Sequence, residues 1–167
     1  PMEEKGIVAT RDKAKERGDE WQIGETLSAA IGQSYNSYTP IQMAKYISML
    51  ANGGEPIDVT IVKSINDVNG NQVSKEDITK FVNAKLGLTK EKKENLNIKK
   101  ENIDAILKGM KGVTSEEGGT AYSTFANFNI ELGGKTGSAQ TDVQGKINGW
   151  FVGFAPYEEP EIAVVVL

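Results

Sequence analysis

The segment FNIELGGKTGSAQ occupies residues 128–140 of this 167-residue chain and has the apolar and glycine-rich pattern of a strand. A polar turn follows at 142–146, and then the apolar run WFVGFA at 150–155. A turn bounded by two prolines leads into a last apolar run at 162–167. Because short turns join strands that are antiparallel neighbours, the pattern predicts a three-stranded meander.

Two amphipathic helices are predicted to flank this sheet. The first begins at Pro40 with Thr39 as its N-cap, and Gly53 ends it. The second covers residues 99–112. We therefore expect an α/β chain of the α+β type, an antiparallel sheet with flanking helices. The apolar positions recur at helical spacing and predict core-facing sides, formed by Met43, Ile47, Leu50 and Ala51 in the first helix and by Ile103, Ile106, Leu107 and Met110 in the second.

The middle of the chain is more polar. Residues 57–74 alternate and turn at Asn69-Gly70, which predicts a short hairpin. Residues 75–101 are rich in Lys, Glu and Asn, with acidic and basic residues interleaved. This composition favours a solvated insertion or a lid-like helical segment over a charged binding surface.

Composition excludes several kinds of chemistry. The chain has no Cys and no His, so thiolate nucleophiles, disulfides, a Ser-His-Asp triad and Cys- or His-ligated metals are excluded. An EF-hand-like start at Asp67 fails as well, because Gln72 and Ile78 stand where that loop needs Gly and a bidentate Glu. We expect no metal and no organic cofactor.

Charge and hydropathy limit the partners. The net charge is −4, from 19 basic and 23 acidic residues, which argues against nucleic-acid binding. No apolar stretch approaches the roughly 18 residues of a membrane span, and no signal peptide is visible. The chain opens Pro1-Met2-Glu3 and stops inside an apolar run, so we expect a piece of a longer protein, with a membrane anchor upstream left open.

The segment Gly134-Lys135-Thr136-Gly137-Ser138 carries candidate chemistry. On a strand, Lys135 and Gly137 are expected to face one side, and Thr136 and Ser138 the other. An ammonium, two hydroxyls and free backbone N–H groups suit a carboxylate and a developing oxyanion. Gly137 has no side chain, so a substrate backbone can lie against the strand. On the tripeptide alone, a strand lysine among tolerated glycines is the favoured explanation.

Three blocks in this order sharpen the interpretation. They read WQIGETLSAAIGQSYNSYTPIQMA at 21–44, GGKTGSAQT at 133–141 and GWFVGFAPYEEPEIAVVVL at 149–167. Together they resemble the C-terminal half of the transpeptidase domain of class B penicillin-binding proteins, of the elongation or sporulation type. The resemblance covers about two-thirds of the chain, and the GQ-x-YNSYTP block is far more specific than KTG.

The resemblance implies a D,D-transpeptidase with a penicillin-recognising serine enzyme fold, which cross-links peptidoglycan stem peptides and is trapped by β-lactams. By this resemblance, Lys135 would supply positive charge and join the proton-relay network. The hydroxyls of Thr136 and Ser138 would bind the carboxylate of the donor peptide. The Ser138 N–H would be one arm of the oxyanion hole. Gly137 and Ala139 would line the edge along which the substrate lies as an extra strand.

The chain departs from the family pattern in one respect. Of the motifs SxxK, SxN and K[ST]G, only the third is assigned. Ser34-Tyr35-Asn36 fits SxN as a string but lies inside a block that follows the true motif, so Ser34 is interpreted as a turn residue. The SxxK-like strings at Thr10 and Thr60 are rejected for lack of a helical apolar setting. The nucleophile is therefore expected upstream of Pro1, and the chain alone is expected to be inactive.

Two other function classes stay open at this stage. One is a β-lactamase or β-lactam sensor of the same fold, for which no deacylating carboxylate is identifiable. The other is a non-catalytic scaffold domain that has lost its nucleophile, which the upstream sequence would decide. For the transpeptidase, the resemblance implies a D-Ala-D-Ala donor, an acceptor amine, and by analogy a cell-wall glycosyltransferase as partner. It also implies a place on the extracytoplasmic face of the membrane.

Overall fold

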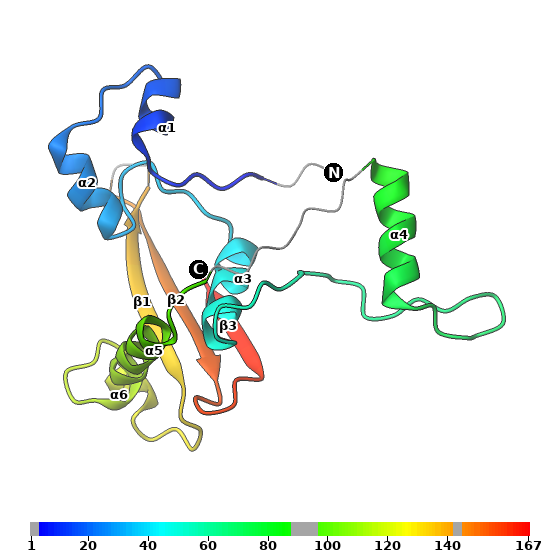
Figure 1. The fold of residues 1–167 in the computed structure, drawn as a ribbon. Helices are drawn as coiled ribbons and strands as arrows, with labels where there is room; N and C mark the ends of the chain where they lie inside the picture. Colours follow the sequence, from blue (N-terminus) through cyan, green and yellow to red (C-terminus); the bar gives the residue numbers. More distant parts are fainter. Residues whose placement is uncertain (1–3, 88–96, 142–144) are drawn as a thin grey trace.

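The computed structural model describes residues 4–87, 97–141 and 145–167. Within these residues an antiparallel sheet carries helices packed against it, with further helices around one end (Figure 1). The α+β architecture predicted from the sequence is confirmed. In chain order the elements are α1 (Arg11–Glu16), α2 (Ile23–Ala30), α3 (Pro40–Ala51), α4 (Lys75–Leu86), α5 (Lys100–Ser115), α6 (Tyr122–Phe125), β1 (Gly133–Gln140), β2 (Ile147–Ala155) and β3 (Ile162–Val166).

The sheet has the strand order β1-β2-β3, and both pairs are antiparallel. This is the predicted meander. Residues that pair across strands share a face, so Val152 and Phe154 lie on one face with Ala163 and Val165 of β3. Part of the predicted turn at 142–146 lies outside the described residues.

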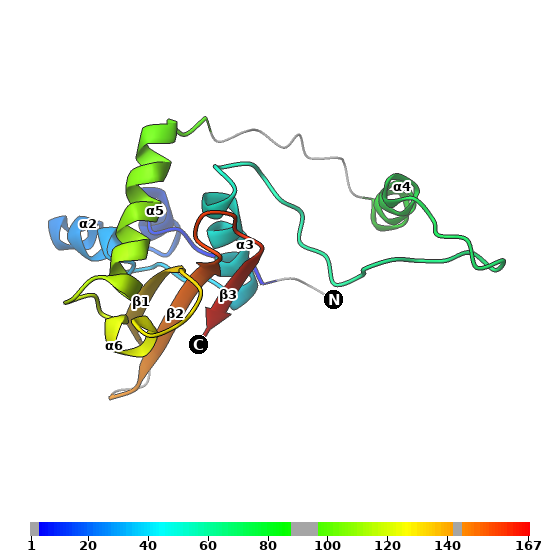
Figure 2. The same cartoon turned by 90° about the horizontal axis from the view of Figure 1, so that it is seen from below.

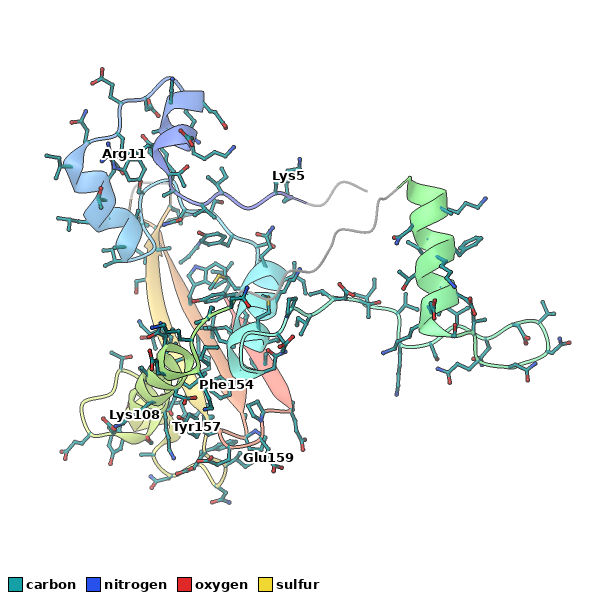
Figure 3. All side chains as sticks on the ribbon, in the orientation of Figure 1. Lys5, Arg11, Lys108, Phe154, Tyr157 and Glu159 are labelled. Carbon is teal, nitrogen blue, oxygen red and sulfur yellow. The ribbon has the colours of Figure 1, made fainter. Side chains whose placement is uncertain are left out.

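The core forms where α3 and α5 meet the face of the sheet that carries Val152 and Phe154. Ile47 and Leu50 of α3 and Met110 of α5 are buried against these two side chains. Phe154 is only 2% exposed, and its ring stacks on that of Tyr157 at 5.9 Å between centroids. Figure 3 labels the two residues near each other, beside α5. The predicted core-facing sides are confirmed, except that Ile106 is 42% exposed.

The helix α3 begins and ends as its sequence predicts. The Thr39 hydroxyl accepts from the Gln42 N–H, and the Gln42 side chain accepts from the Thr39 N–H, which completes a capping box. Pro40 occupies the first turn, where it needs no hydrogen-bond donor. After Asn52, Gly53 takes a φ of 81°, which lets the chain leave the helix.

The sheet approaches α5 closely at the start of β1. A Cβ added at Gly133 would lie 2.6 Å from the Phe154 ring, and one at Gly134 would lie 2.8 Å from the Phe151 ring. The paired glycines are therefore required by packing, because any side chain there would push the rings of β2 away. Thr114 of α5 closes this junction by donating to the carbonyl of Leu132 at 2.6 Å.

Two expected strand segments do not form. Residues 57–65 are irregular, and a single bridge between Asn66 and Gln72 closes the turn at Asn69-Gly70. The predicted hairpin is therefore confirmed only around its turn, where backbone hydrogen bonds of 2.8 Å join Val73 to Ile65 and Asp67 to Asn71. Its arms do not extend into strands, because a two-stranded ribbon needs an apolar face to pack against. Residues 128–132 also precede β1 without joining the sheet.

The segment at 55–87 stands away from the sheet in both views (Figures 1 and 2). It contains α4, which Ser74 caps by accepting from the Asp77 N–H. Part of the predicted insertion is thus a helix, while residues 88–96 lie outside the described residues. In the described ranges, none of the helices has the length and apolar character needed to cross a membrane.

Candidate functional site

A groove of about 910 Å³ runs between β1 and the loop that joins α2 to α3. One wall is the β1 stretch from Lys135 to Gln140, and the other is the loop 32–38, with Trp150 and Val152 below. The groove therefore brings together two of the sequence blocks that are about a hundred residues apart. Both walls end near α1 and α2 at the same end of the sheet (Figure 1).

The β1 side chains alternate as the strand pattern predicts. Lys135 is paired with Val152, on the face that α3 covers, and Thr136 is paired with Phe151 on the other. The Thr136 hydroxyl lies 2.7 Å from the hydroxyl of Thr120. Lys135 bends its ammonium to the carbonyl of Thr136, 2.6 Å away. Both residues line the groove, the ammonium on the Thr136 carbonyl and the hydroxyl on Thr120.

The outer edge of β1 carries backbone groups whose hydrogen-bond partners lie outside the sheet. The carbonyl of Ser138 accepts from the side-chain amide of Gln33 at 3.0 Å, and that of Thr136 accepts from Lys135. Neither partner belongs to β2, so both carbonyls point away from the sheet. In a strand, the N–H and C=O of one residue point the same way, so the Ser138 N–H also faces the groove. This edge offers donors and acceptors to an extended ligand.

The opposite wall is held by Asn36. Its side-chain amide donates to the carbonyls of Gln33 and Ala29, at 3.0 and 3.2 Å, and its oxygen accepts from the Ala9 N–H at 2.9 Å. The turn needs φ values of 83° at Gly32 and 64° at Ser34. The Ser34 hydroxyl donates to the carboxylate of Glu25. Ser34 is therefore a turn residue in the wall, as interpreted from its sequence position.

Two tyrosines of this wall stay protonated well above neutral pH. Desolvation raises the pKa of Tyr35, and the neighbouring Asp19 carboxylate, which accepts from its hydroxyl at 3.2 Å, raises it further. Burial is also the first cause of the raised pKa of Tyr38, followed by Tyr46. The guanidinium of Arg17 lies 5.2 Å from the Tyr35 ring centroid. These rings act as neutral hydrogen-bonding and packing groups.

The structure adds two residues that motif reasoning missed. Thr120 follows Gly119, which packs so tightly that an added Cβ would lie 2.4 Å from the carbonyl of Gly112. That turn brings the Thr120 hydroxyl to Thr136. Gln33 belongs to the GQ-x-YNSYTP block, whose sequence does not indicate a function for this side chain. The sequence around these two residues matches no motif that would predict a function. Only the fold, which brings both side chains to β1, identifies them.

The two SxxK-like strings lie away from the groove. Thr10 is the N-cap of α1, where its hydroxyl accepts from the Lys13 N–H, and Thr60 lies in the irregular segment after α3. Neither lines the groove. Across the described ranges, no group of three or more His, Cys, Asp or Glu side chains could hold a metal ion. Ala139, the last candidate on β1, lines the groove beside Ser138.

This arrangement places a strand edge, a lysine and hydroxyls around one groove. Comparison with known proteins identifies the family. Residues 6–167 match the family described as the penicillin binding protein transpeptidase domain, so the chain belongs to that family. Its relatives are class B penicillin-binding proteins.

Three similar proteins illustrate this. The chain is 35% identical over 153 residues to "Penicillin-binding protein H" of Bacillus subtilis, covering 86% of this chain and 20% of that protein. It is 27% identical over 175 residues to "Peptidoglycan D,D-transpeptidase MrdA" of Haemophilus influenzae, covering 96% and 25%. The crystal structure of Pseudomonas aeruginosa PBP2 in complex with WCK 5153 superimposes with a TM-score of 0.75 at 31% identity, covering 96% and 32%. The chain thus spans a fifth to a third of these proteins.

Proposed function

We propose that this chain is the C-terminal part of a peptidoglycan D,D-transpeptidase that also binds penicillin, and that it supplies one wall of the active site. Family membership supports the class of enzyme, and a similar protein bears the name peptidoglycan D,D-transpeptidase. The observation that carries the proposal is the outer edge of β1, where Lys135, Thr136 and the backbone of Ser138 meet one groove.

Each residue of this edge has a role that follows from its chemistry. Lys135 supplies positive charge and takes part in proton transfer. The hydroxyls of Thr136 and Ser138 bind the carboxylate of the donor peptide or of a β-lactam. The N–H of Ser138 stabilises the oxyanion, because it faces the groove and has no partner on β2. Gly137 and Ala139 line the path of the ligand, which lies as an added strand.

The reaction needs a nucleophile that this chain does not carry. We assign it to a serine, activated by a lysine, in the part of the protein upstream of Pro1. The serine oxygen attacks the penultimate D-alanine carbonyl, the peptide bond to the last D-alanine breaks, and free D-alanine leaves with the proton. An amine of a neighbouring stem peptide then takes the acyl group, forms a new amide and returns the proton to the serine.

The same chemistry explains penicillin binding. A β-lactam ring opens when the serine attacks its carbonyl, and the acyl group stays on the enzyme.

The substrates of this reaction imply where the domain works. Peptidoglycan lies outside the cytoplasmic membrane, so the domain is expected on the extracytoplasmic face, with an anchor outside this chain. A glycosyltransferase that makes the glycan strands is the partner expected beside it. The charged segment 75–101 is then a variable insertion, and its described helix α4 does not line the groove.

The proposal is tested by the intact mass of the protein before and after incubation with a penicillin. The full-length enzyme is expected to gain one penicillin, whereas the 167-residue chain keeps its mass. An adduct on the short chain would contradict the assignment of the nucleophile and make Ser34 the first residue to substitute. A full-length protein without an adduct would contradict the function.

Substitutions in the full-length protein test the roles of the edge. Lys135→Ala is expected to slow acylation by about 100-fold or more while the folded state is kept, since it removes a charge that acts in the transition state. Thr136→Val removes one hydroxyl and is expected to slow it less. Ser34→Ala is the matched control on the opposite wall, and acylation is expected to be largely kept. Equal rates in Lys135→Ala and wild type would contradict the assigned role.

A further inference from the structure

The outer edge of β1 has a hydrogen-bond partner from within the chain itself. Ser138 presents a carbonyl and an N–H to the groove, and the side-chain amide of Gln33 donates to that carbonyl at 3.0 Å. A ligand that adds to this edge as a strand offers its amide N–H to the same carbonyl and its own carbonyl to the Ser138 N–H. Gln33 therefore holds the position that the N–H of an extended ligand needs.

The backbone of Gln33 is fixed, whereas only its side chain reaches the strand. Its N–H donates to the carbonyl of Ser28 at 2.9 Å, and its carbonyl accepts from the Asn36 side chain at 3.0 Å. The side chain of Gln33 crosses the groove from this anchored point to a residue 105 positions away in sequence. Rotation about the side-chain bonds can thus free the Ser138 carbonyl without moving the loop.

We propose that Gln33 is a specificity-determining residue, a removable cap whose amide imitates a ligand N–H on the ligand-binding edge of β1. This inference rests on the proposed function, which places the ligand along β1. The cap occupies the acceptor of Ser138 and leaves the N–H of the same residue open. A ligand whose reacting carbonyl is flanked by an amide N–H must displace the cap, and a ligand that lacks this N–H need not.

Two β-lactams separate these cases. A penicillin carries an acylamino side chain with an amide N–H, and a carbapenem carries a hydroxyethyl group in its place. In the full-length enzyme, Gln33→Met removes the donor and keeps the length of the side chain. It is expected to speed acylation by a penicillin by about 2- to 10-fold, the effect of one net hydrogen bond. Acylation by the carbapenem is expected to stay unchanged.

A second variant and a matched control complete the experiment. Gln33→Ala is expected to speed acylation by the penicillin and not by the carbapenem, as Gln33→Met does. A difference between the two variants would identify an effect of how the methionine side chain packs. Gln22→Met makes the same change at an exposed glutamine outside the groove and is expected to alter neither rate. Stopped-flow or mass-resolved acylation kinetics supply the ratio of the two rates, which a purely structural role of Gln33 would not move.

The outcomes are distinct. Three results would overturn the proposal that Gln33 caps the Ser138 carbonyl. These are equal changes with both β-lactams, slower acylation by the penicillin, and no change in either rate. Aggregation of the Gln33 variants with unchanged kinetics would also overturn it, and would make Gln33 a guard against edge-to-edge pairing. If the wild-type enzyme reacts with neither compound, the proposed function itself fails, a result separate from those in which the wild type reacts.

Discussion

The sheet with its covering helices and the segment at 55–87 use the same kinds of apolar side chain in opposite ways. Phe154 is 2% exposed between α3, α5 and Tyr157, whereas Phe81 of α4 is 64% exposed. Ile47 is buried in the core, and Ile61 is 99% exposed. Figure 2 shows α4 well separated from the sheet. Apolar composition therefore does not distinguish the two regions.

The difference lies in how far apart in sequence the stabilising contacts are. The core joins residues of α3, α5 and β2, which are separated by up to about a hundred positions. The helix α4 is held by local interactions, its Ser74 cap and the i,i+4 ion pair between Lys80 and Glu76. Exposed pairs of this kind contribute little. We therefore expect substitutions to affect global stability strongly in one region and weakly in the other.

The largest expected effect is at Phe154. Phe154→Ala is expected to lower the free energy of unfolding by about 3–5 kcal/mol, because it removes a fully buried ring and leaves a cavity beside Met110 and Leu50. Chemical denaturation of the purified protein measures this change. Phe81→Ala, the same substitution on α4, is expected to stay within about 0.5 kcal/mol of wild type. A comparable loss in both variants would show that α4 packs against the core.

A smaller effect is expected where α5 meets β1. Thr114→Val keeps the shape of the side chain but leaves the buried carbonyl of Leu132 without the hydroxyl that donates to it. The expected cost is about 1–3 kcal/mol in the same denaturation experiment. Ser115→Ala removes a neighbouring hydroxyl that donates to the carbonyl of Lys111 at an exposed position. That control is expected to change the free energy of unfolding by less than about 0.5 kcal/mol. Equal losses of stability in the two variants would show that the Thr114–Leu132 hydrogen bond contributes nothing special to the contact between α5 and β1.

The smallest effect is a local pH response in the segment 55–87. Asp67 accepts from the Asn71 N–H, from the Asn71 side chain and from the Asn69 N–H, and these hydrogen bonds hold its pKa below 3.8. A carboxylate with a lowered pKa stabilises the turn above its unfolded pKa, and this contribution is lost as the pH falls through the folded value. Amide resonances of residues 69–71 are expected to shift with a midpoint below 3.8.

This titration has its own control. In Asp67→Ala the low-pH transition of residues 69–71 is expected to disappear, while resonances of β1 are unaffected. A midpoint at or above 3.8 would mean that the carboxylate does not accept these hydrogen bonds in solution. A simultaneous shift in β1 would connect the turn to the sheet and remove the contrast between the two regions.

Local signals predicted much of the fold. The Thr39 cap, Pro40 and Gly53 fixed the bounds of α3, since capping and turn chemistry act within a few residues. The apolar runs at 150–155 and 162–167 became β2 and β3. The hairpin predicted at 57–74 formed only around its turn, because alternation shows which side of a strand could be buried without showing what would cover it. The prediction that Ile106 faces the core was wrong for a related reason. The apolar stripe of a helix can be wider than the surface that the helix packs against, and Ile106 is left exposed.

The candidate site divides in the same way. Strand periodicity alone placed Lys135 and Thr136 on opposite faces, because the spacing of a strand allows no other arrangement. The partners of those residues depend on the tertiary structure: Thr120 reaches Thr136 through a tight glycine turn, and Gln33 reaches Ser138 across 105 positions. Hydrogen bonds between distant segments leave no periodic pattern. Composition and local spacing thus determined the elements and the chemistry of β1, and the packing of distant segments decided which side chains meet that strand.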